Sequence, residues 1–220
     1  MIKAFVFDFD GLIIDTEEPV YRSWLEVYQA HGQELPFDRW IQIVGSSTAM
    51  FDPKGHLEER LGRALTPDEL GRRVERRAQM VLAEPIRPGV ADLTAAARAA
   101  GLRVGVASSS TCQWVNGHLK RLGISERFDC VRCRDDVAAV KPAPDLYLAV
   151  LECLGVKAEE AVAIEDSPNG IAAAKAAGMW CVAVPNVITG GLDLSQADTI
   201  LTTLEGITPP DLVREIGLTL

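Results

Sequence analysis

The stretch KAFVFDFDG, residues 3–11, decides the fold predicted for this chain. Its nearly continuous apolar run is typical of a strand that is buried on both faces, as in parallel sheets. Asp8 and Asp10 lie at the carboxyl end of this run, and residues two apart in a strand point to the same side. Two carboxylates so close repel each other, so the pair requires a shared proton or a cation. Asp10-Gly11 alone could be a turn, but Asp8 interrupts a buried run and favours a functional pair.

Further apolar runs follow downstream and alternate with helical patterns. One such helix covers Pro144–Leu154 and ends at Gly155, and another begins after the N-cap residue Ser167. This alternation predicts an α/β fold with a doubly wound, parallel, Rossmann-like sheet, whose ligand binds beyond the carboxyl ends of the strands. The predicted strands are Lys3–Phe9, Leu102–Ala107, Phe128–Val131, Ala161–Ile164 and Cys181–Val184.

The connection between the first two predicted strands is too long for a simple crossover. It exceeds ninety residues, whereas a βαβ unit needs only about 30. Within it, Val20, Trp24 and Tyr28 recur at helical spacing, and Thr66 with Glu69 forms a capping-box pattern. We therefore predict a small helical cap domain at residues 16–83, inserted into a Rossmann-like core that comprises residues 1–15 and 84–220.

Composition narrows the classes of partner. The chain has 220 residues and a net charge of −9, which argues against nucleic acid and against an anionic membrane. No apolar run approaches the ~20 residues of a membrane span. Five cysteines at irregular spacing make a poor disulfide framework, so we expect thiols, with Cys130 and Cys133 beside a buried strand. A cytoplasmic location is the expectation.

Three more groups of polar residues lie near the ends of the predicted elements. Two of them directly follow a predicted strand, and one precedes a predicted helix. Ser108–Thr111 could cradle a phosphate or simply cap a helix, and Lys141 could present a fixed charge or be solvated. Glu165 and Asp166 could be hard oxygen ligands for Mg²⁺, or Asp166 could be a helix cap. Because all of these residues fall where a doubly wound sheet binds its ligand, together they form a complete set for phosphoryl transfer.

The order of these segments resembles the haloacid dehalogenase superfamily, in the subgroup with a helical cap after the first strand. The matching segments are DFDGLIIDTE (Asp8–Glu17), VASSS (Val106–Ser110), VKPAPD (Val140–Asp145) and IEDSPNG (Ile164–Gly170). The resemblance covers the chain from Asp8 to Gly170 with four motifs in order. It is specific for the superfamily and much less specific for the substrate.

The resemblance implies a role for each matching residue. Asp8 would attack phosphorus and form an aspartyl-phosphate, and Asp10 would act as the general acid and base. Ser108, Ser109 and Lys141 would bind the phosphoryl group. The ligands of Mg²⁺ would be Asp8, the backbone carbonyl of Asp10, Asp166 and, directly or through water, Glu165.

The implied function is a Mg²⁺-dependent phosphatase of small phosphorylated metabolites. The alternative is a sugar-phosphate mutase resembling β-phosphoglucomutase, but the cap histidine of that mutase would fall at Val20, which cannot make its hydrogen bond. A phospho-accepting signalling domain is disfavoured by the inserted cap, and a non-catalytic phosphate-binding protein is disfavoured because no motif position is lost.

Substrate choice is assigned to the cap. The candidates are Thr16 at the hinge, Ser46, and Lys54 beside the predicted helix break at Asp52-Pro53. The arginines between residues 72 and 77 are interpreted as a solvated helix face, and the four tryptophans as packing residues. The expected partner is a small phosphorylated metabolite, and the expected state is a monomer or weak dimer.

Overall fold

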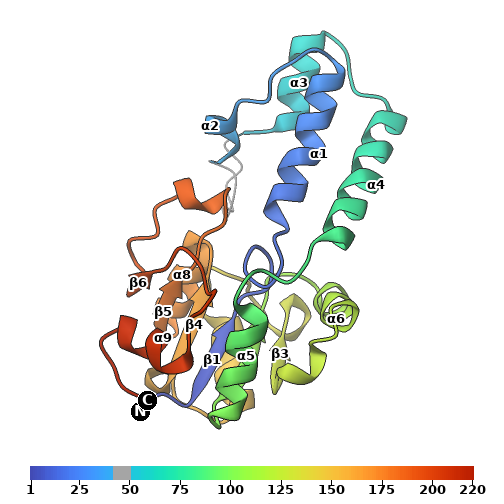
Figure 1. Ribbon diagram of the computed structural model, residues 1–220. Coiled ribbons are helices and arrows are strands. Elements are labelled where there is room, and N and C mark those ends of the chain that lie inside the picture. The colour runs from blue at the N-terminus through green and yellow to red at the C-terminus, as the bar shows by residue number, and fades with distance from the viewer. Residues whose placement is uncertain (42–50) are drawn as a thin grey trace.

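The computed structural model describes residues 1–41 and 51–220 of the chain. Its centre is a six-stranded sheet in the order β3-β2-β1-β4-β5-β6, in which all neighbouring strands are parallel (Figure 1). The first strand therefore lies inside the sheet, between β2 and β4, and the sheet grows outward from it in both directions. This order confirms the predicted doubly wound core. The strands are β1 (Ala4–Phe7), β2 (Arg103–Ala107), β3 (Cys130–Arg132), β4 (Ala161–Glu165), β5 (Trp180–Ala183) and β6 (Thr199–Ile200).

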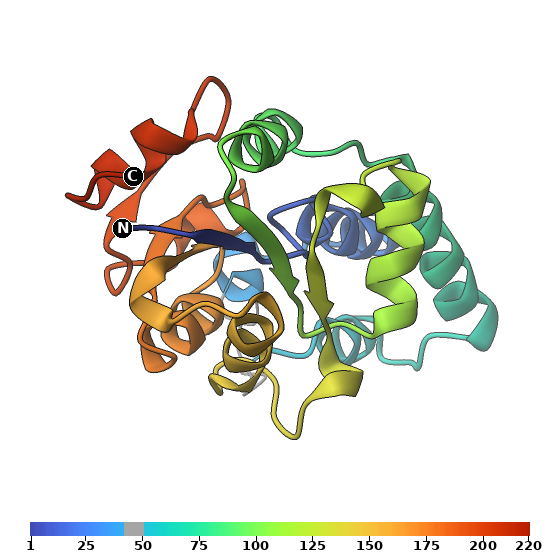
Figure 2. The same cartoon turned by 90° about the horizontal axis from the view of Figure 1, so that it is seen from below.

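Helices cover both faces of the sheet because alternate strand residues point to opposite sides. Phe5 and Phe7 of β1 pack toward one face, whereas Ala4 and Val6 pack toward the other. Figure 2 shows the sheet between α5 and α9 on one side and α7 and α8 on the other. The first layer comprises α5 (Val90–Ala99), α6 (Cys112–Arg121) and α9 (Pro209–Glu215), and the second comprises α7 (Asp145–Leu154) and α8 (Pro168–Ala176).

A second group of helices lies beyond one end of the sheet (Figure 1). Its buried residues, among them Trp24, Tyr28 and Leu57, form a hydrophobic cluster separate from the two that flank the sheet. We propose that this group is the cap domain, with the boundaries predicted above. Its helices are α1 (Glu17–Ala30), α2 (Phe37–Trp40), α3 (Pro53–Leu61) and α4 (Pro67–Ala83).

The two segments that join the cap helices to the sheet meet each other. The backbone N–H of Arg87 donates to the carbonyl of Ile13 at 2.9 Å, so the outgoing and returning chains are hydrogen-bonded. The Arg87 guanidinium also donates to the carbonyls of Gly11, Val184 and Pro185. Both segments are thereby anchored at the carboxyl end of the central strands.

Local signals in the sequence set several helix ends. The capping box between Thr66 and Glu69 opens α4, the Ser167 hydroxyl accepts from the Gly170 N–H at the start of α8, and Gly155 ends α7 in the left-handed conformation. None of the helices within the described ranges combines the length and apolar character that a membrane crossing needs. The described residues also include four short 3₁₀ helices: η1 (Ser125–Arg127), η2 (Arg134–Asp136), η3 (Ala158–Glu160) and η4 (Thr189–Gly191).

The cysteines differ from the sequence-based expectation. Cys130 on β3 and Cys153 on α7 form a disulfide, with their Cα atoms 6.2 Å apart. The expectation of a free thiol at Cys130 was therefore wrong, because α7 packs directly against β3 and brings together two residues that are 23 positions apart. Cys112, Cys133 and Cys181 are free.

Candidate active site

The carboxyl ends of the central strands open into a cavity of about 650 Å³. Asp8 follows β1, Ser109 and Ser110 follow β2, and Asp166 follows β4, so adjacent parallel strands deliver their polar residues to one place. Lys141, from the segment before α7, also lines the cavity. Thr16, Glu17 and Val20 from the beginning of α1, together with Arg77 of α4, line the side facing the cap helices.

Lys141 holds the centre of the site. Its ammonium group donates to an oxygen of Asp8 and, at 2.6 Å, to Oε1 of Glu165. The Tyr147 hydroxyl donates to the same Glu165 oxygen at 2.7 Å, and the Glu165 side chain is fully buried. This network fixes both the lysine and Asp8 in position. Removing one partner of a buried, hydrogen-bonded ion pair of this kind strongly destabilises the folded protein, because the other charge stays buried without compensation.

Burial works against ionisation of the acidic residues. Desolvation raises the pKa of Asp8 to about 8, opposed by the charge of Lys141 and reinforced by Glu165. The pKa of Asp166 also lies well above its ordinary value, because of burial first and then the charges of Asp8 and Glu165. A divalent cation bound between these carboxyl groups would favour their ionised forms and offset both the burial and the mutual repulsion.

The acidic residues also have the composition of a hard-cation site. One carboxylate oxygen from each of Asp8, Glu165 and Asp166 lies within 4.8 Å of the others, and all three residues are buried. Oxygen-only ligands suit Mg²⁺ rather than thiophilic metals. The residues therefore fit a divalent cation, and Asn186 orients one of them by donating to Oδ2 of Asp166 at 2.9 Å.

Two glycines allow the backbone to approach these carboxylates. A Cβ at Gly11 would lie 2.1 Å from Oδ2 of Asp166, and the φ angle of Gly11 is +86°. A Cβ at Gly170 would lie 1.9 Å from the carboxylate of Glu165. Only residues without a side chain permit this packing, since real Cβ contacts are longer than about 3 Å.

Asp10 lies in a different environment from Asp8. Its Oδ2 accepts hydrogen bonds from the hydroxyls of Ser110 at 2.6 Å and Ser108 at 3.4 Å, and its Oδ1 accepts from Nε1 of Trp114 at 3.0 Å. The Ser108 hydroxyl in turn accepts from the Ser110 N–H at 3.0 Å. Asp10 therefore accepts hydrogen bonds from neutral donors, whereas Asp8 accepts one from the charged ammonium group of Lys141.

The structure groups most of the predicted site residues. Asp8, Asp10, Ser109, Lys141 and Asp166 line the cavity, Ser108 and Glu165 contact those residues from buried positions, and the predicted hinge residue Thr16 lines the cavity as well.

The cap candidates are less well supported. Lys54 forms an ion pair with Glu58 at 2.7 Å and is not among the described residues that line the cavity. Ser46 lies outside the described residues. Their proposed roles in substrate binding stay predictions.

Several residues of the site escaped the sequence reasoning, among them Trp114, Arg77 and Asn186. Trp114 was interpreted as a packing residue, but its indole donates to Asp10. Arg77 was interpreted as part of a solvated face, but it lines the cavity. Asn186 gave no signal at all, because it lies in a loop after β5 and reaches Asp166 only through the fold.

Comparison with known proteins agrees with this geometry. The family model described as haloacid dehalogenase-like hydrolase matches residues 2–178. The chain belongs to this family. Among the relatives of this hydrolase, YhcW of Bacillus subtilis, a proposed phosphatase, is 47% identical over 199 residues, which cover 90% of each chain. These findings establish the chain as a haloacid dehalogenase-like hydrolase of the phosphatase type.

Solved structures and a mutase extend the comparison. The crystal structure of CbbY from Rhodobacter sphaeroides in complex with phosphate has a TM-score of 0.71 and 31% identity, covering 99% of this hydrolase and 100% of that chain. A mutant of the same CbbY has been solved in complex with xylulose-(1,5)bisphosphate, with 31% identity over 96% of this hydrolase and 99% of that chain, and a TM-score of 0.71. β-Phosphoglucomutase of B. subtilis is 32% identical over 83% of each chain.

Glu17 provides a test of the electrostatics of the cavity. Burial, with the charges of Asp10 and Asp15 in addition, raises its pKa from 4.5 to about 7. The folded protein thus holds a proton that the unfolded chain has lost, so this group makes stability fall as pH rises from about 4.5 to about 7. We expect Glu17→Gln to stabilise the metal-free protein at pH 8 by about 1–3 kcal/mol more than at pH 4.

Urea unfolding of the wild type and of Glu17→Gln, each at pH 4 and pH 8, measures this difference in the free energy of unfolding. Glu18→Gln is the matched control, because Glu18 contacts Arg22 and is not among the described residues that line the cavity. Equal effects of the two substitutions at both pH values would contradict the assignment of a half-buried Glu17 that holds a proton in the folded protein.

Proposed function

We propose that this chain is a Mg²⁺-dependent phosphatase of small phosphorylated metabolites, such as sugar phosphates. The observation that carries the proposal is the buried Asp8, held by Lys141 at the base of a 650 Å³ cavity that Asp10 also lines. The phosphate bound to the related CbbY supports phosphate as the group recognised. The cavity volume suits a small metabolite rather than a polymer.

In the proposed first step, a carboxylate oxygen of Asp8 attacks phosphorus, and the bond from phosphorus to the leaving oxygen breaks. Asp10 donates its proton to that oxygen, and an aspartyl-phosphate remains on Asp8. In the second step Asp10 takes a proton from water, whose oxygen attacks phosphorus. The bond between phosphorus and the Asp8 oxygen breaks, which releases inorganic phosphate and restores the Asp8 carboxylate. Lys141 and the hydroxyls of Ser108 and Ser109 bind the phosphoryl oxygens in both steps.

The residues that would hold Mg²⁺ are Asp8, the backbone carbonyl of Asp10, and Asp166. The bound ion offsets the charge repulsion between a carboxylate and a phosphate group. Both oxygens of Glu165 already accept hydrogen bonds, from Lys141 and Tyr147 on one side and from the Asp166 N–H on the other. We therefore assign Glu165 to positioning Lys141.

A sugar-phosphate mutase is the second candidate, favoured by the similarity to β-phosphoglucomutase. The cavity argues for hydrolysis, because Val20 lines it where the histidine of that mutase would fall. An apolar side chain there cannot hydrogen-bond a proton donor or acceptor on the substrate.

Phosphate release from a panel of phosphorylated metabolites tests both candidates. The panel includes sugar monophosphates, a sugar bisphosphate, phosphoglycolate and nucleoside monophosphates, each with Mg²⁺ and with EDTA. We expect EDTA-sensitive release that is highest for a sugar phosphate. Conversion of β-glucose 1-phosphate to glucose 6-phosphate without free phosphate would identify a mutase and overturn the proposal.

Trp114→Phe tests the proposed control of Asp10. The ring is kept but the donor to Oδ1 of Asp10 is lost, so the carboxylate loses one of three hydrogen bonds. We expect kcat to fall about 5- to 50-fold, because Asp10 is no longer held in one orientation for proton transfer.

Trp180→Phe is the matched control, because Trp180 packs on β5 and contacts Lys175 rather than Asp10. A Trp114→Phe variant with unchanged kcat would show that the indole only packs.

A further inference from the structure

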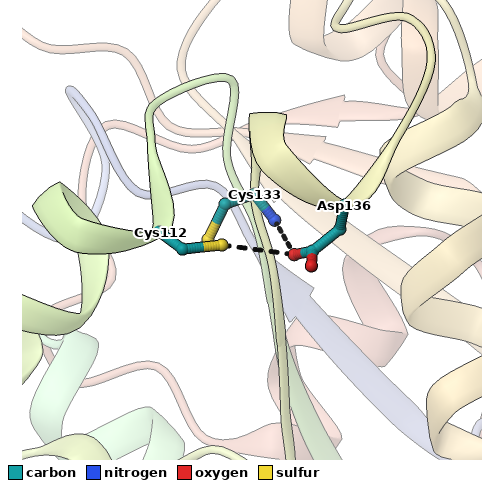
Figure 3. Close-up of side chains that lie close together, drawn as sticks. All are labelled: Cys112, Cys133 and Asp136. Atoms are coloured by element: carbon teal, nitrogen blue, oxygen red, sulfur yellow. Dashed lines mark hydrogen bonds between the residues drawn. The ribbon is translucent and has the colours of Figure 1, made fainter.

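Two free cysteines and an aspartate meet on one side of the sheet, away from the carboxylates that surround Lys141. Cys112 is the first residue of α6, Cys133 directly follows β3, and Asp136 ends η2 (Figure 3). Their two sulfur atoms and one carboxylate oxygen all lie within 4.8 Å of one another. Three separate elements thus bring three metal-ligating side chains to one point.

The contacts within the cluster have the dimensions of a metal site. Sγ of Cys112 lies 3.3 Å from Oδ2 of Asp136, and the N–H of Cys133 donates to the same oxygen at 2.8 Å. In a tetrahedral zinc site, Zn–S bonds of about 2.3 Å and Zn–O bonds of about 2.0 Å place sulfur and oxygen roughly 3.5 Å apart. The observed distance between Sγ of Cys112 and Oδ2 of Asp136 is close to this value.

We propose that Cys112, Cys133 and Asp136 bind one thiophilic divalent cation of the Zn²⁺ class, with water as the fourth ligand. Two sulfurs and one oxygen suit zinc and disfavour Mg²⁺, which selects oxygen ligands. This site is separate from the oxygen-only set of Asp8, Glu165 and Asp166. It does not depend on the proposed phosphatase function.

Access and charge at the cluster are consistent with a cation. Cys133 is buried and Cys112 half-buried, whereas Asp136 is exposed, so the cluster can be reached from solvent on the Asp136 side. The carboxylate of the neighbouring Asp135 accepts from the Cys112 N–H at 2.7 Å and adds a second negative charge beside the site.

Cation binding at this cluster must release protons. A metal ion is bound by the thiolate form of cysteine, so the Cys112 and Cys133 thiols must lose their protons when the cation binds. Formation of two metal–thiolate bonds then releases two protons to solvent. The affinity for the cation is therefore expected to rise as pH rises from 6 to 8.

The cluster also adjoins the segment after β2 that faces the cavity. The N–H of Arg134 donates to the carbonyl of Ser110 at 2.9 Å, and its guanidinium donates to the carbonyl of Ser109 at 3.1 Å. A cation bound between Cys112 and Cys133 would join the start of α6 to the end of β3. It would therefore help to hold Ser109 and Ser110 in place on the side away from the cavity.

Anaerobic titration with Co²⁺, in the presence of saturating Mg²⁺ and without reductant, tests the proposal. The Mg²⁺ occupies the oxygen-only site, and only thiolate ligands give sulfur-to-cobalt charge-transfer absorption. We expect one equivalent of Co²⁺ to bind with this absorption and to be displaced by Zn²⁺. Cys112→Ser and Asp136→Asn should each weaken binding at least about tenfold, and Cys112→Ser should reduce the charge-transfer intensity.

Cys181→Ala is the matched control, because Cys181 is a free, buried cysteine on β5 and does not belong to the cluster. It should bind Co²⁺ like the wild type, and circular dichroism checks that each variant is folded. Co²⁺ binding without charge-transfer absorption, or unchanged in Cys112→Ser, would overturn the proposal. So would resistance of Cys112 and Cys133 to alkylation until a reductant is added, because that pair would then be a disulfide.

Discussion

Asp8→Asn is expected to lower kcat for phosphate release by at least about 10³-fold, because the amide cannot form the aspartyl-phosphate. The amide keeps the size of the side chain, so the cavity should keep its shape. Loss of one of three clustered carboxylates should also weaken Mg²⁺ binding. Steady-state kinetics, together with calorimetric titration of Mg²⁺, measure the two effects separately.

Asp92→Asn is the control for Asp8→Asn, because Asp92 is an exposed residue in the first turn of α5. Mass spectrometry of acid-quenched enzyme should detect a phosphorylated Asp8 peptide in the wild type and none in Asp8→Asn. A variant that keeps more than a tenth of wild-type kcat would exclude Asp8 as the nucleophile.

Lys141→Met is expected to destabilise the metal-free protein by about 3–5 kcal/mol, because it leaves Glu165 and Asp8 without the cation that neutralises them. Burial of all three side chains makes the effect large: those of Lys141 and Glu165 are 5% and 0% exposed. We also expect kcat to fall at least about 10²-fold, because a charged donor to the phosphoryl oxygens is lost. Urea unfolding and kinetics measure these changes.

Lys175→Met is the matched control, since Lys175 pairs with Asp198 in a half-exposed ion pair at 2.7 Å. Such a pair contributes only about 0–1 kcal/mol. If both substitutions changed the free energy of unfolding equally, the Lys141 network would not be the stabilising element described above.

The sequence predicted the core of the fold because its signals are local. Buried strands show as apolar runs, and Asp8, Lys141 and Asp166 fall at strand or helix ends, where a parallel sheet collects polar groups. The edge strand β6 was missed because it has two residues and no apolar run. The predicted first strand, Lys3–Phe9, was longer than the observed Ala4–Phe7, since the chain stays buried beyond the last ladder hydrogen bonds.

Contacts between distant segments were beyond the sequence reasoning. The indole of Trp114 reaches Asp10 across 104 positions, and Asn186 reaches Asp166 only because β4 and β5 are neighbours. The Cys130–Cys153 disulfide depends in the same way on how α7 packs against β3. The spacing of residues along one helix or strand carries no information about contacts between distant segments of the chain.

The hydrogen bond between the Arg87 N–H and the Ile13 carbonyl has an evolutionary consequence. Because the two ends of the inserted segment already touch, an insert of another length or fold could replace it without altering the strand order behind it. The carboxylates at the strand ends would then keep their positions while the covering segment changes. A lineage with this architecture can acquire new substrates by exchanging one module and conserving the chemistry beneath it.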